Sequence, residues 1–479
     1  MKIAKPSKPT IAAKPGQPAY SNLFVTSKPG KKLDCTLCYR LCTLEPGQKG
    51  PCGHRENADG RLRLTGHGEI TCFIRDVIGF GGNPFASYKP NTPAVFIGGS
   101  RCTAACTFCS SGRAVHKPDA LPKVTPTGEA PPHVAKYTEA GLGDLWYGPR
   151  GFLDPWFAVQ SALAQGAMAI TLGINEPLLT WEWSRDVARV AKENGLFVCV
   201  ESNGFATTEA IEAIAPFVDA VDVGIKGSSD PEFYARRMRS PGGEVAALKA
   251  IETWARTDAH LIVGDLLAPP RMQDEAAFRE SARRFYDHVL NVAGPVVDLL
   301  STIILRPQAT GGAVPGEPIV PLEQWPGVSD RMDEAEDLAH AAGLPFVRHY
   351  PRSLPCPCGA DLLTNIDICK ETLPRGQECR TMSGFCDRQR TLTNVTSDSK
   401  CVSCGRDVPV VPQTKAEQAE ALRRIHNAVD DVFGDALPLG AALKLPDGVE
   451  QAERPVFPRS WTALSSTTGP HPASPGAST

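Results

Sequence analysis

The chain has 479 residues, enough for one large α/β domain with appendages or for two or three domains. Its 50 Lys and Arg residues nearly balance its 53 Asp and Glu residues, and the net charge of -3 argues against a protein that binds polyanions. No apolar run approaches the roughly eighteen residues of a membrane span, and the first thirty residues lack the apolar centre of a signal peptide. We therefore expect a cytoplasmic protein with no nucleic-acid or membrane partner.

Sixteen cysteines stand out in a chain that is expected to occupy a reducing compartment, where thiols bind metal more often than they form disulfides. Cys72 and Cys199 stand alone and are predicted to be buried hydrophobic side chains. The others fall into three groups: Cys35, Cys38, Cys42 and Cys52; Cys102, Cys106 and Cys109; and Cys356, Cys358, Cys369, Cys379, Cys386, Cys401 and Cys404.

Composition divides the chain into six segments. Residues 1–32 are rich in Pro and Lys, which predicts a disordered tail, and a second disordered tail is expected at residues 459–479. Between the tails we expect a Cys-rich N-terminal segment (33–90), an α/β domain (91–352), a Cys-rich metal-binding segment (353–410) and a C-terminal helix with an extension (411–458).

Apolar, strand-like runs alternate with helical patterns through the α/β segment, which predicts βα units around a parallel sheet. Two of the helical patterns end on Gly195 and Gly343, as helix C-termini often do. A Pro/Gly-rich stretch at 112–150 interrupts the alternation and is predicted to be a loop or lid. The strand-like runs are 94–99, 169–174, 196–202, 220–226, 260–267, 298–306 and 345–350.

A helical pattern follows the last group of cysteines, at residues 414–434. Thr414 and Glu417 have the spacing of a capping box. Apolar residues share one face of the helix, and we expect that face to pack on the body of the protein: Leu422, Ile425, Val429 and Val432.

Cys102, Cys106 and Cys109 directly follow the first strand-like run. Three thiolates within eight residues can hold three corners of a cubane iron–sulfur cluster and leave the fourth iron open. A zinc knuckle is the alternative, but structural zinc generally takes four ligands. Because ligand sites of α/β folds form at the C-terminal ends of strands, the position favours an iron–sulfur cluster.

This Cys-x3-Cys-x2-Cys loop, with Phe108 before its last cysteine, resembles the signature of the radical S-adenosylmethionine (SAM) enzymes. The resemblance implies a partial (β/α)6 TIM-like barrel, a [4Fe–4S] cluster on the three cysteines, and SAM bound to the open iron near Phe108. It further implies reductive cleavage of SAM to a 5′-deoxyadenosyl radical, which would abstract hydrogen from a protein, peptide or small-molecule substrate. An electron donor such as flavodoxin or ferredoxin would be the partner.

Polar residues after successive strand-like runs match the family's SAM-binding positions in order. Asn175 and Glu176 follow the second run, and the resemblance implies that Glu176 meets the amino group of SAM; a helix N-terminal charge is the alternative. Ser202 and Asn203 follow the third run, where relatives bind the ribose or the methionine carboxylate. Lys226 ends the fourth run as a partner for that carboxylate.

Asp265 and Arg306 also lie near the ends of strand-like runs. Each could face a substrate or be structural.

A narrower resemblance runs from about Cys35 to Cys404, to the AmmeMemoRadiSam subgroup related to pyruvate formate-lyase activating enzymes. It rests on the Gly47–Cys52 turn and on the stretches NEPLL, VESNGF and EFYARRM. The chain departs from the subgroup at Tyr39, at residues 110–112 and in the extended 112–150 stretch. Because these positions lie nearest the predicted cluster and lid, no substrate is carried over.

The two outer cysteine groups are predicted to be auxiliary metal sites. The four N-terminal cysteines suit zinc, a single iron or a second cubane. The C-terminal CPCG and CVSCG turns together make a four-cysteine site that resembles a zinc ribbon or rubredoxin, whereas Cys369, Cys379 and Cys386 have no obvious fourth partner. Thiolates suit both iron–sulfur clusters and zinc, so both remain open.

The predicted function is therefore that of a radical SAM enzyme. The alternatives are a glycyl-radical-enzyme activase, a cobalamin-dependent methyltransferase, for which no cobalamin-binding segment is recognisable, and a non-catalytic Cys-rich metal or redox protein. The last alternative does not explain why Glu176, Ser202 and Lys226 follow strands in series.

Overall fold

The computed structural model describes residues 18–79, 83–109, 111–112, 115, 151–304, 327–349, 354–367 and 389–433. Nearly all of the predicted lid, the residues after 433, and Arg306, Cys369, Cys379 and Cys386 lie outside these ranges.

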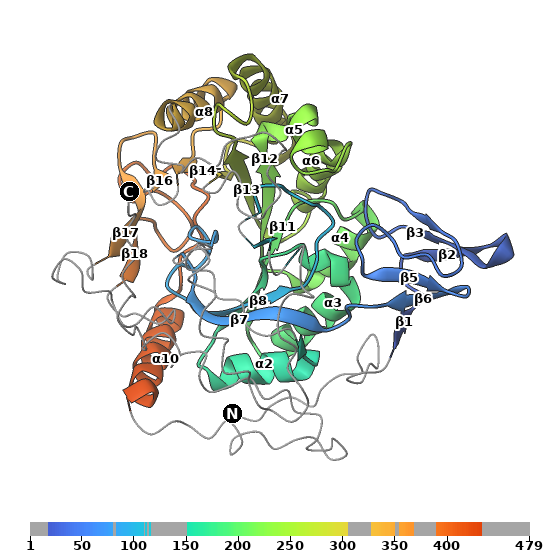
Figure 1. Ribbon diagram of the computed structural model, residues 1–479. Coiled ribbons are helices and arrows are strands. Elements are labelled where there is room, and N and C mark those ends of the chain that lie inside the picture. The colour runs from blue at the N-terminus through green and yellow to red at the C-terminus, as the bar shows by residue number, and fades with distance from the viewer. Residues whose placement is uncertain are drawn as a thin grey trace, which may run out of the picture.

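A nine-stranded sheet forms the centre of the molecule, in the order β15-β14-β13-β12-β11-β10-β8-β7-β9 (Figure 1). All seven predicted runs form its parallel strands, which confirms the partial barrel, and no pairing joins the edge strands β9 and β15 in the described part of the chain. The parallel strands are β8 (Pro93–Gly99), β10 (Ala169–Gly173), β11 (Phe197–Ser202), β12 (Ala220–Lys226), β13 (His260–Leu267), β14 (Asp298–Ile303) and β15 (Val347–His349).

Two further strands extend the sheet beyond β8. β7 (Glu69–Val77) pairs antiparallel with β8, and the short β9 (Gly151–Phe152) pairs antiparallel with β7. β7 therefore belongs to the central sheet, although the sequence placed it within the Cys-rich N-terminal segment.

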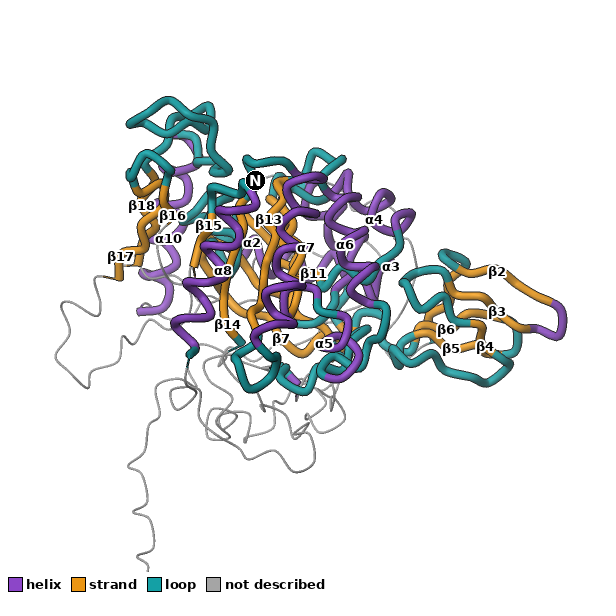
Figure 2. Tube along the Cα trace, turned by 90° about the horizontal axis from the view of Figure 1, so that it is seen from above, coloured by secondary structure: helices purple, strands orange, loops and turns teal. Residues whose placement is uncertain are grey.

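Helices cover the outer face of the curved sheet (Figures 1 and 2). Side chains alternate along each strand. On β12, Val221, Val223 and Ile225 pack into the main core, which leaves Asp222 and Lys226 on the opposite, inner face. The principal helices are α2 (Pro155–Ala164), α3 (Trp181–Glu193), α4 (Thr208–Ile214), α5 (Pro231–Arg236), α6 (Gly243–Trp254), α7 (Glu275–Ala293) and α8 (Val328–Ala342).

A second, smaller core closes the amino-terminal end of the barrel. Ile78, Phe85 and Tyr88, which come before β8, pack there against side chains from the beginnings of the strands. Cys199 is one of these and is fully buried, as is Cys72 on β7. The carboxyl ends of the strands lie at the opposite end of the barrel.

Two small antiparallel sheets precede the barrel. One has the order β1 (Ala19–Ser21), β6 (Arg61–Leu64) and β5 (Arg55–Ala58), and the other β2 (Val25–Lys28), β3 (Lys32–Cys35) and β4 (Thr43–Leu44). Residues 19–21 and 25–28 therefore form strands, although the sequence predicted a disordered tail there. Their strands are too short to show a hydrophobic period and depend on pairing with β6 and β3.

A third small sheet, β16 (Leu354–Pro355), β17 (Asp361–Asp367) and β18 (Gln389–Thr393), follows the barrel. It lies on the side of the barrel opposite the N-terminal sheets (Figures 1 and 2). The predicted C-terminal helix is α10 (Lys415–Phe433), and its capping box is confirmed by hydrogen bonds in both directions between Thr414 and Glu417. Leu422 on the expected packing face is 37% exposed, whereas the neighbouring Ala421 is buried.

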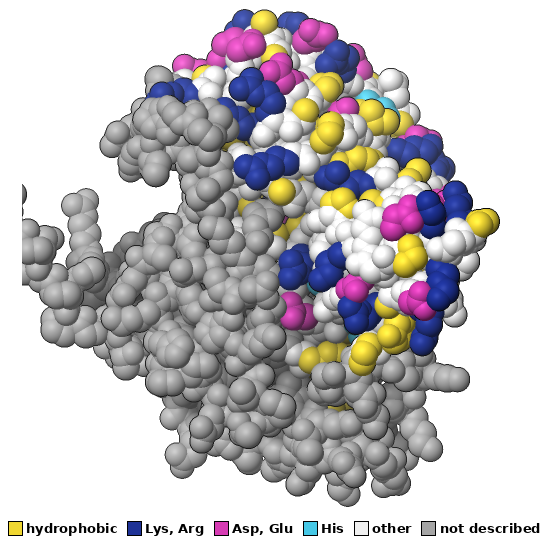
Figure 3. All heavy atoms as spheres, turned by 45° about the vertical axis from the view of Figure 1, so that its right-hand side comes forward, with side chains coloured by type: hydrophobic (Ala, Val, Ile, Leu, Met, Phe, Trp, Pro, Cys, Tyr) yellow, Lys and Arg dark blue, Asp and Glu magenta, His cyan; other side chains and the backbone are white. Residues whose placement is uncertain are grey.

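The described surface mixes charges of both signs. On the face shown in Figure 3, basic and acidic side chains are interspersed, in keeping with the small net charge of the chain. Of the helices in the described ranges, none has the length and apolar character needed to span a bilayer.

Candidate active site

The cysteine loop, residues 100–109, leaves β8 at the carboxyl-terminal end of the barrel. Its backbone is fixed to the turn after α5, because the Ala105 N–H donates to the Met238 carbonyl (3.0 Å) and the Thr107 N–H donates to the Arg237 carbonyl (2.8 Å). Cys102, Cys106 and Cys109 are all partly exposed on this loop. The predicted cluster ligands thus lie on one anchored loop at the strand ends.

The start of the loop is held by Asn175, which the sequence predicted to contact SAM. Its Oδ1 accepts a hydrogen bond from the Gly99 N–H (2.8 Å). Next to these residues, Arg101 and the β-branched Ile174 have positive φ values of 65° and 71°. Such strained conformations persist only where the surroundings fix them, and they cluster at functional sites.

Glu176 is a buried connector between two strand ends and is only 2% exposed. Its carboxylate accepts hydrogen bonds from the Ser202 hydroxyl (3.0 Å) and from the Asn203 N–H (2.7 Å), both at the end of β11. It also accepts from the Leu178 N–H (3.0 Å) and so caps the short 3-10 helix η4 (Pro177–Thr180). Burial raises its pKa, although these donors act in the opposite direction. The geometry therefore fits the alternative role for Glu176, a negative charge at the N-terminus of a helix.

Asn203 touches the cysteine loop directly. Its Nδ2 donates to the Thr103 hydroxyl (3.0 Å) and lies 3.6 Å from the Cys102 sulfur, within hydrogen-bonding range of a thiolate. Its Oδ1 accepts from the Phe205 N–H (3.1 Å), which fixes the orientation of the amide. The sequence predicted a role in SAM binding for Asn203 but not this contact with a cluster ligand.

Lys226 supplies positive charge to the cysteine loop. Burial raises the pKa of Cys102, Cys106 and Cys109, that of Cys109 to about 12, and the charge of Lys226 partly offsets the shift for all three thiols. Thiols with raised pKa values stay protonated unless a bound metal cation stabilises the thiolate form. The donor set therefore fits an iron–sulfur cluster.

The spacing of the sulfurs also distinguishes the cysteine groups. Ligand sulfurs of a cubane cluster stand roughly 6 Å apart, well beyond the spacing around a single ion. Among the described residues, the cysteine loop does not form a group whose sulfurs all lie within 4.8 Å of one another, whereas the C-terminal four-cysteine group does. At least two sulfurs of the cysteine loop are therefore farther apart than any two of the C-terminal group.

Two acidic side chains that the sequence analysis missed face the inside of the barrel. Glu201 Oε2 accepts from the Ile174 N–H (3.2 Å), whereas Asp222 Oδ1 is buried and accepts no hydrogen bond from the described residues. Burial, together with the charge of Glu201, raises the pKa of Asp222 to about 7. The signal in the sequence was a charged residue within each otherwise apolar run.

Glycines open space around these groups. A Cβ at Gly264 would lie 2.8 Å from Asp222 Oδ1, and a Cβ at Gly173 would lie 2.5 Å from Glu201 Oε2. The carboxylates of Glu201 and Asp222 thus occupy space that any side chain at Gly173 or Gly264 would need.

Two other predicted site residues have structural surroundings. Phe108 is buried in the main core, with its ring centroid 5.4 Å from that of Phe233. Asp265 is fully buried and accepts from the Ser228 hydroxyl (2.8 Å) and the Tyr286 hydroxyl (2.9 Å). These contacts fit the structural alternative for Asp265.

The N-terminal cysteines lie beside the same end of the barrel. Cys38 forms a β-bridge with Ala206, and the Arg40 guanidinium donates to the Ser240 hydroxyl (3.1 Å) and to the Thr103 carbonyl (3.4 Å). Burial raises the pKa of Cys38 to about 12, and the nearby thiols of Cys52, Cys35 and Cys42 add to the shift. The four cysteines are therefore gathered next to the cysteine loop.

The chain thus forms a partial α/β barrel with three cysteines after its first parallel strand and polar side chains at the next strand ends. The family model described as the radical SAM superfamily matches residues 96–276. The chain therefore contains a radical SAM domain at residues 96–276.

Among curated proteins, the chain is 26% identical over 214 residues to the uncharacterized protein MJ0808 of Methanocaldococcus jannaschii. The match covers 45% of this chain and spans about half, 55%, of that relative's length. Among solved structures, SuiB from Streptococcus suis is 11% identical with a TM-score of 0.32, covering 52% of this chain and 47% of that one. QueE from Escherichia coli is 15% identical with a TM-score of 0.29, covering 56% of this chain and 88% of that one.

Proposed function

We propose that this protein is a radical SAM enzyme that cleaves SAM reductively and abstracts hydrogen from a protein, peptide or small-molecule substrate. The contact between Asn203 and the sulfur of Cys102 carries the proposal, because it joins a predicted SAM-site residue to a predicted cluster ligand within the matched domain. When bound, a [4Fe–4S] cluster on Cys102, Cys106 and Cys109 supplies the electron that cleaves SAM to a 5′-deoxyadenosyl radical.

The chain's own residues would hold the reactants in place. Asn203 stabilises the Cys102 thiolate, and Glu176 fixes the ends of β10 and β11 with respect to each other. Lys226, whose ammonium group reaches the Gly224 carbonyl, provides the positive charge for the methionine carboxylate of SAM. Asn175, Ser202 and Phe108 complete the proposed SAM site.

The substrate would enter from the carboxyl-terminal end of the barrel, because Phe85 and Tyr88 fill the other end. There it would meet Glu201 and Asp222 on the inner face, which favour a substrate group that carries a positive charge or an N–H donor. Activation of a glycyl-radical enzyme, as in the subgroup that the sequence resembles, is one version of this proposal. A flavodoxin or ferredoxin in a reducing cytoplasm would be the electron donor.

The N-terminal group Cys35, Cys38, Cys42 and Cys52 is proposed as an auxiliary metal site. Its position beside the cysteine loop would suit a second cluster that passes electrons inward.

Anaerobic iron–sulfur reconstitution tests the proposal. Wild type should bind iron and form 5′-deoxyadenosine from SAM after reduction, whereas the triple variant Cys102→Ala, Cys106→Ala, Cys109→Ala should lose about four irons and all SAM cleavage. Cys72→Ala, which removes a buried thiol outside the site, is the matched control and should keep both. A wild-type protein that binds only zinc and leaves SAM intact would contradict the proposal.

A further inference from the structure

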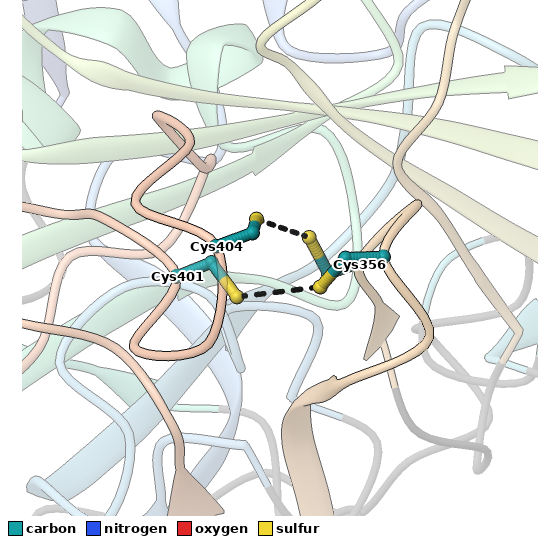
Figure 4. A group of neighbouring side chains, drawn as sticks. Cys356, Cys401 and Cys404 are labelled. Atoms are coloured by element: carbon teal, nitrogen blue, oxygen red, sulfur yellow. Dashed lines mark hydrogen bonds between the residues drawn. The ribbon is translucent and has the colours of Figure 1, made fainter.

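The C-terminal cysteines Cys356, Cys358, Cys401 and Cys404, here called the C-terminal four-cysteine site, converge from two turns of the chain. The sulfurs of Cys356 and Cys404 are 3.8 Å apart, as are those of Cys358 and Cys401, and all four lie within 4.8 Å of one another (Figure 4). Disulfide sulfurs would be about 2.05 Å apart, so the four side chains are free thiols arranged around a common centre.

The distances identify the kind of centre. Four thiolates about 2.3 Å from one ion occupy the corners of a tetrahedron whose edges are about 3.8 Å long. The observed spacing matches those edges and is too short for the roughly 6 Å between ligand sulfurs of a cubane. The site is therefore sized for one ion.

Each turn is closed by a glycine that follows its second cysteine, although one residue separates Cys356 from Cys358 and two separate Cys401 from Cys404. The Gly359 N–H donates to the Cys356 carbonyl (2.8 Å) and the Gly405 N–H donates to the Cys401 carbonyl (2.9 Å), and both glycines have positive φ values, 90° and 71°. Each turn provides one buried and one exposed cysteine, and each close sulfur pair joins a buried cysteine of one turn to an exposed cysteine of the other. The four cysteines therefore supply all four ligands of a tetrahedral site and leave no coordination position open.

The site lies against the closed, amino-terminal end of the barrel. Cys356 and Cys401 belong to a small core with Ala86, which comes before β8, and Phe346, at the beginning of β15. Backbone hydrogen bonds join the same regions, from the Val411 N–H to the Ser87 carbonyl (2.8 Å) and from the Lys89 N–H to the Val411 carbonyl (2.7 Å). The cysteine loop leaves β8 at the other end, so this site is badly placed to pass electrons to it.

We propose that the C-terminal four-cysteine site binds one zinc ion in a closed tetrathiolate centre that ties the C-terminal sheet to the base of the barrel. Its small core offers little apolar burial, and small units of this kind commonly depend on a metal. A closed four-ligand site is the structural type, and residues at the amino-terminal end of a barrel contribute to stability. The inference does not rest on the proposed radical chemistry.

Metal analysis of the purified full-length protein tests the inference, with Cys404→Ser as the diagnostic variant because this side chain is exposed. We expect wild type to hold about one zinc per chain, and the variant to lose it and to melt at least ~5 °C lower. Ser403→Ala, in the same turn, is the matched control and should keep the zinc. Cobalt(II) should give the absorption of a tetrahedral thiolate site in wild type only.

Three outcomes would overturn the inference: a wild type without zinc, a single iron in its place, or a loss of cluster iron from Cys404→Ser. An equal melting temperature for Cys404→Ser and Ser403→Ala would also overturn it. If Cys404→Ser does not fold, Cys358→Ser, the other exposed ligand, gives the same readouts. Because 5′-deoxyadenosine formation is measured separately, failure of the zinc site and failure of the proposed radical SAM activity are distinguishable.

Discussion

Asn203 shows how one side chain can tune the predicted cluster. An N–H donor directed at a ligand sulfur stabilises the more negative, reduced state and raises the reduction potential. We expect Asn203→Ala, which removes the donor to Cys102, to lower the potential by something on the order of tens of millivolts. An anaerobic redox titration followed by electron paramagnetic resonance measures the shift.

Thr103→Ser is the control for this experiment, because it keeps the hydroxyl that Asn203 contacts. Equal potentials for Asn203→Ala and Thr103→Ser would show that the amide does not act on the cluster.

Asp222 carries a stability cost that depends on pH. Its pKa is about 7 in the folded chain and near 4 in an unfolded one, so between these values the folded state holds the extra proton and stability falls as pH rises. Above pH 7 the cost is complete and amounts to at most ~4 kcal/mol. Asp222→Asn should therefore melt at a higher temperature than wild type at pH 8 and at a similar temperature at pH 4.

Asp59→Asn, at an exposed position, serves as the comparison and should give no pH-dependent gain. A gain for Asp222→Asn that is the same at pH 4 and pH 8 would be incompatible with this titration. A buried Asp222 carboxylate that lowers stability would suit a residue whose role is to bind the substrate.

At the scale of elements, the N-terminal sheets are fastened to the barrel by a buried ion pair. Arg55 on β5 donates to both carboxylate oxygens of Glu182 on α3, at 2.7 and 2.9 Å, and the Ser21 hydroxyl of β1 donates to the same carboxylate. Both charged side chains are almost fully buried. Three elements that are distant in sequence therefore meet at one carboxylate.

Removing one partner of this ion pair should destabilise the folded protein much more than replacing both partners. Arg55→Ala leaves the Glu182 charge buried and unpaired, and we expect it to cost about 3–5 kcal/mol. The double variant Arg55→Met, Glu182→Leu should lose far less, because apolar side chains of similar size can replace a buried pair. Urea midpoints of the two proteins test this expectation, and a double variant as unstable as Arg55→Ala would refute it.

The sequence predicted some elements well and others poorly, for physical reasons. The strands β8 and β10 to β15 are parallel and largely buried, so they appear as apolar runs that need no partner to be recognised. β1 and β2 have no such signal, because three or four residues become strands only through their neighbours. The spacing of Cys102, Cys106 and Cys109 was local and therefore readable. The contact between Asn203 and Cys102 joins residues about a hundred positions apart and was not.

At the scale of the whole molecule, two of the proposed metal sites lie at opposite ends of the same barrel: the cysteine loop at the carboxyl ends of the strands, and the C-terminal four-cysteine site at the amino-terminal end. Groups that are well separated and share no partners affect stability additively, to within about 0.5 kcal/mol. We therefore expect the loss of stability in the combined Cys102→Ala, Cys106→Ala, Cys109→Ala, Cys404→Ser variant to equal the sum of the two separate losses.

Denaturant midpoints of the three variants and wild type, all prepared anaerobically with measured iron and zinc, give the comparison. The metal contents should change independently as well, iron with the cysteine loop and zinc with Cys404. A combined loss that differs from the sum by more than ~1 kcal/mol would mean that the barrel transmits strain from one end to the other. The C-terminal four-cysteine site would then do more than stabilise the fold, because its metal occupancy would influence the cysteine loop, where the chemistry is proposed to occur.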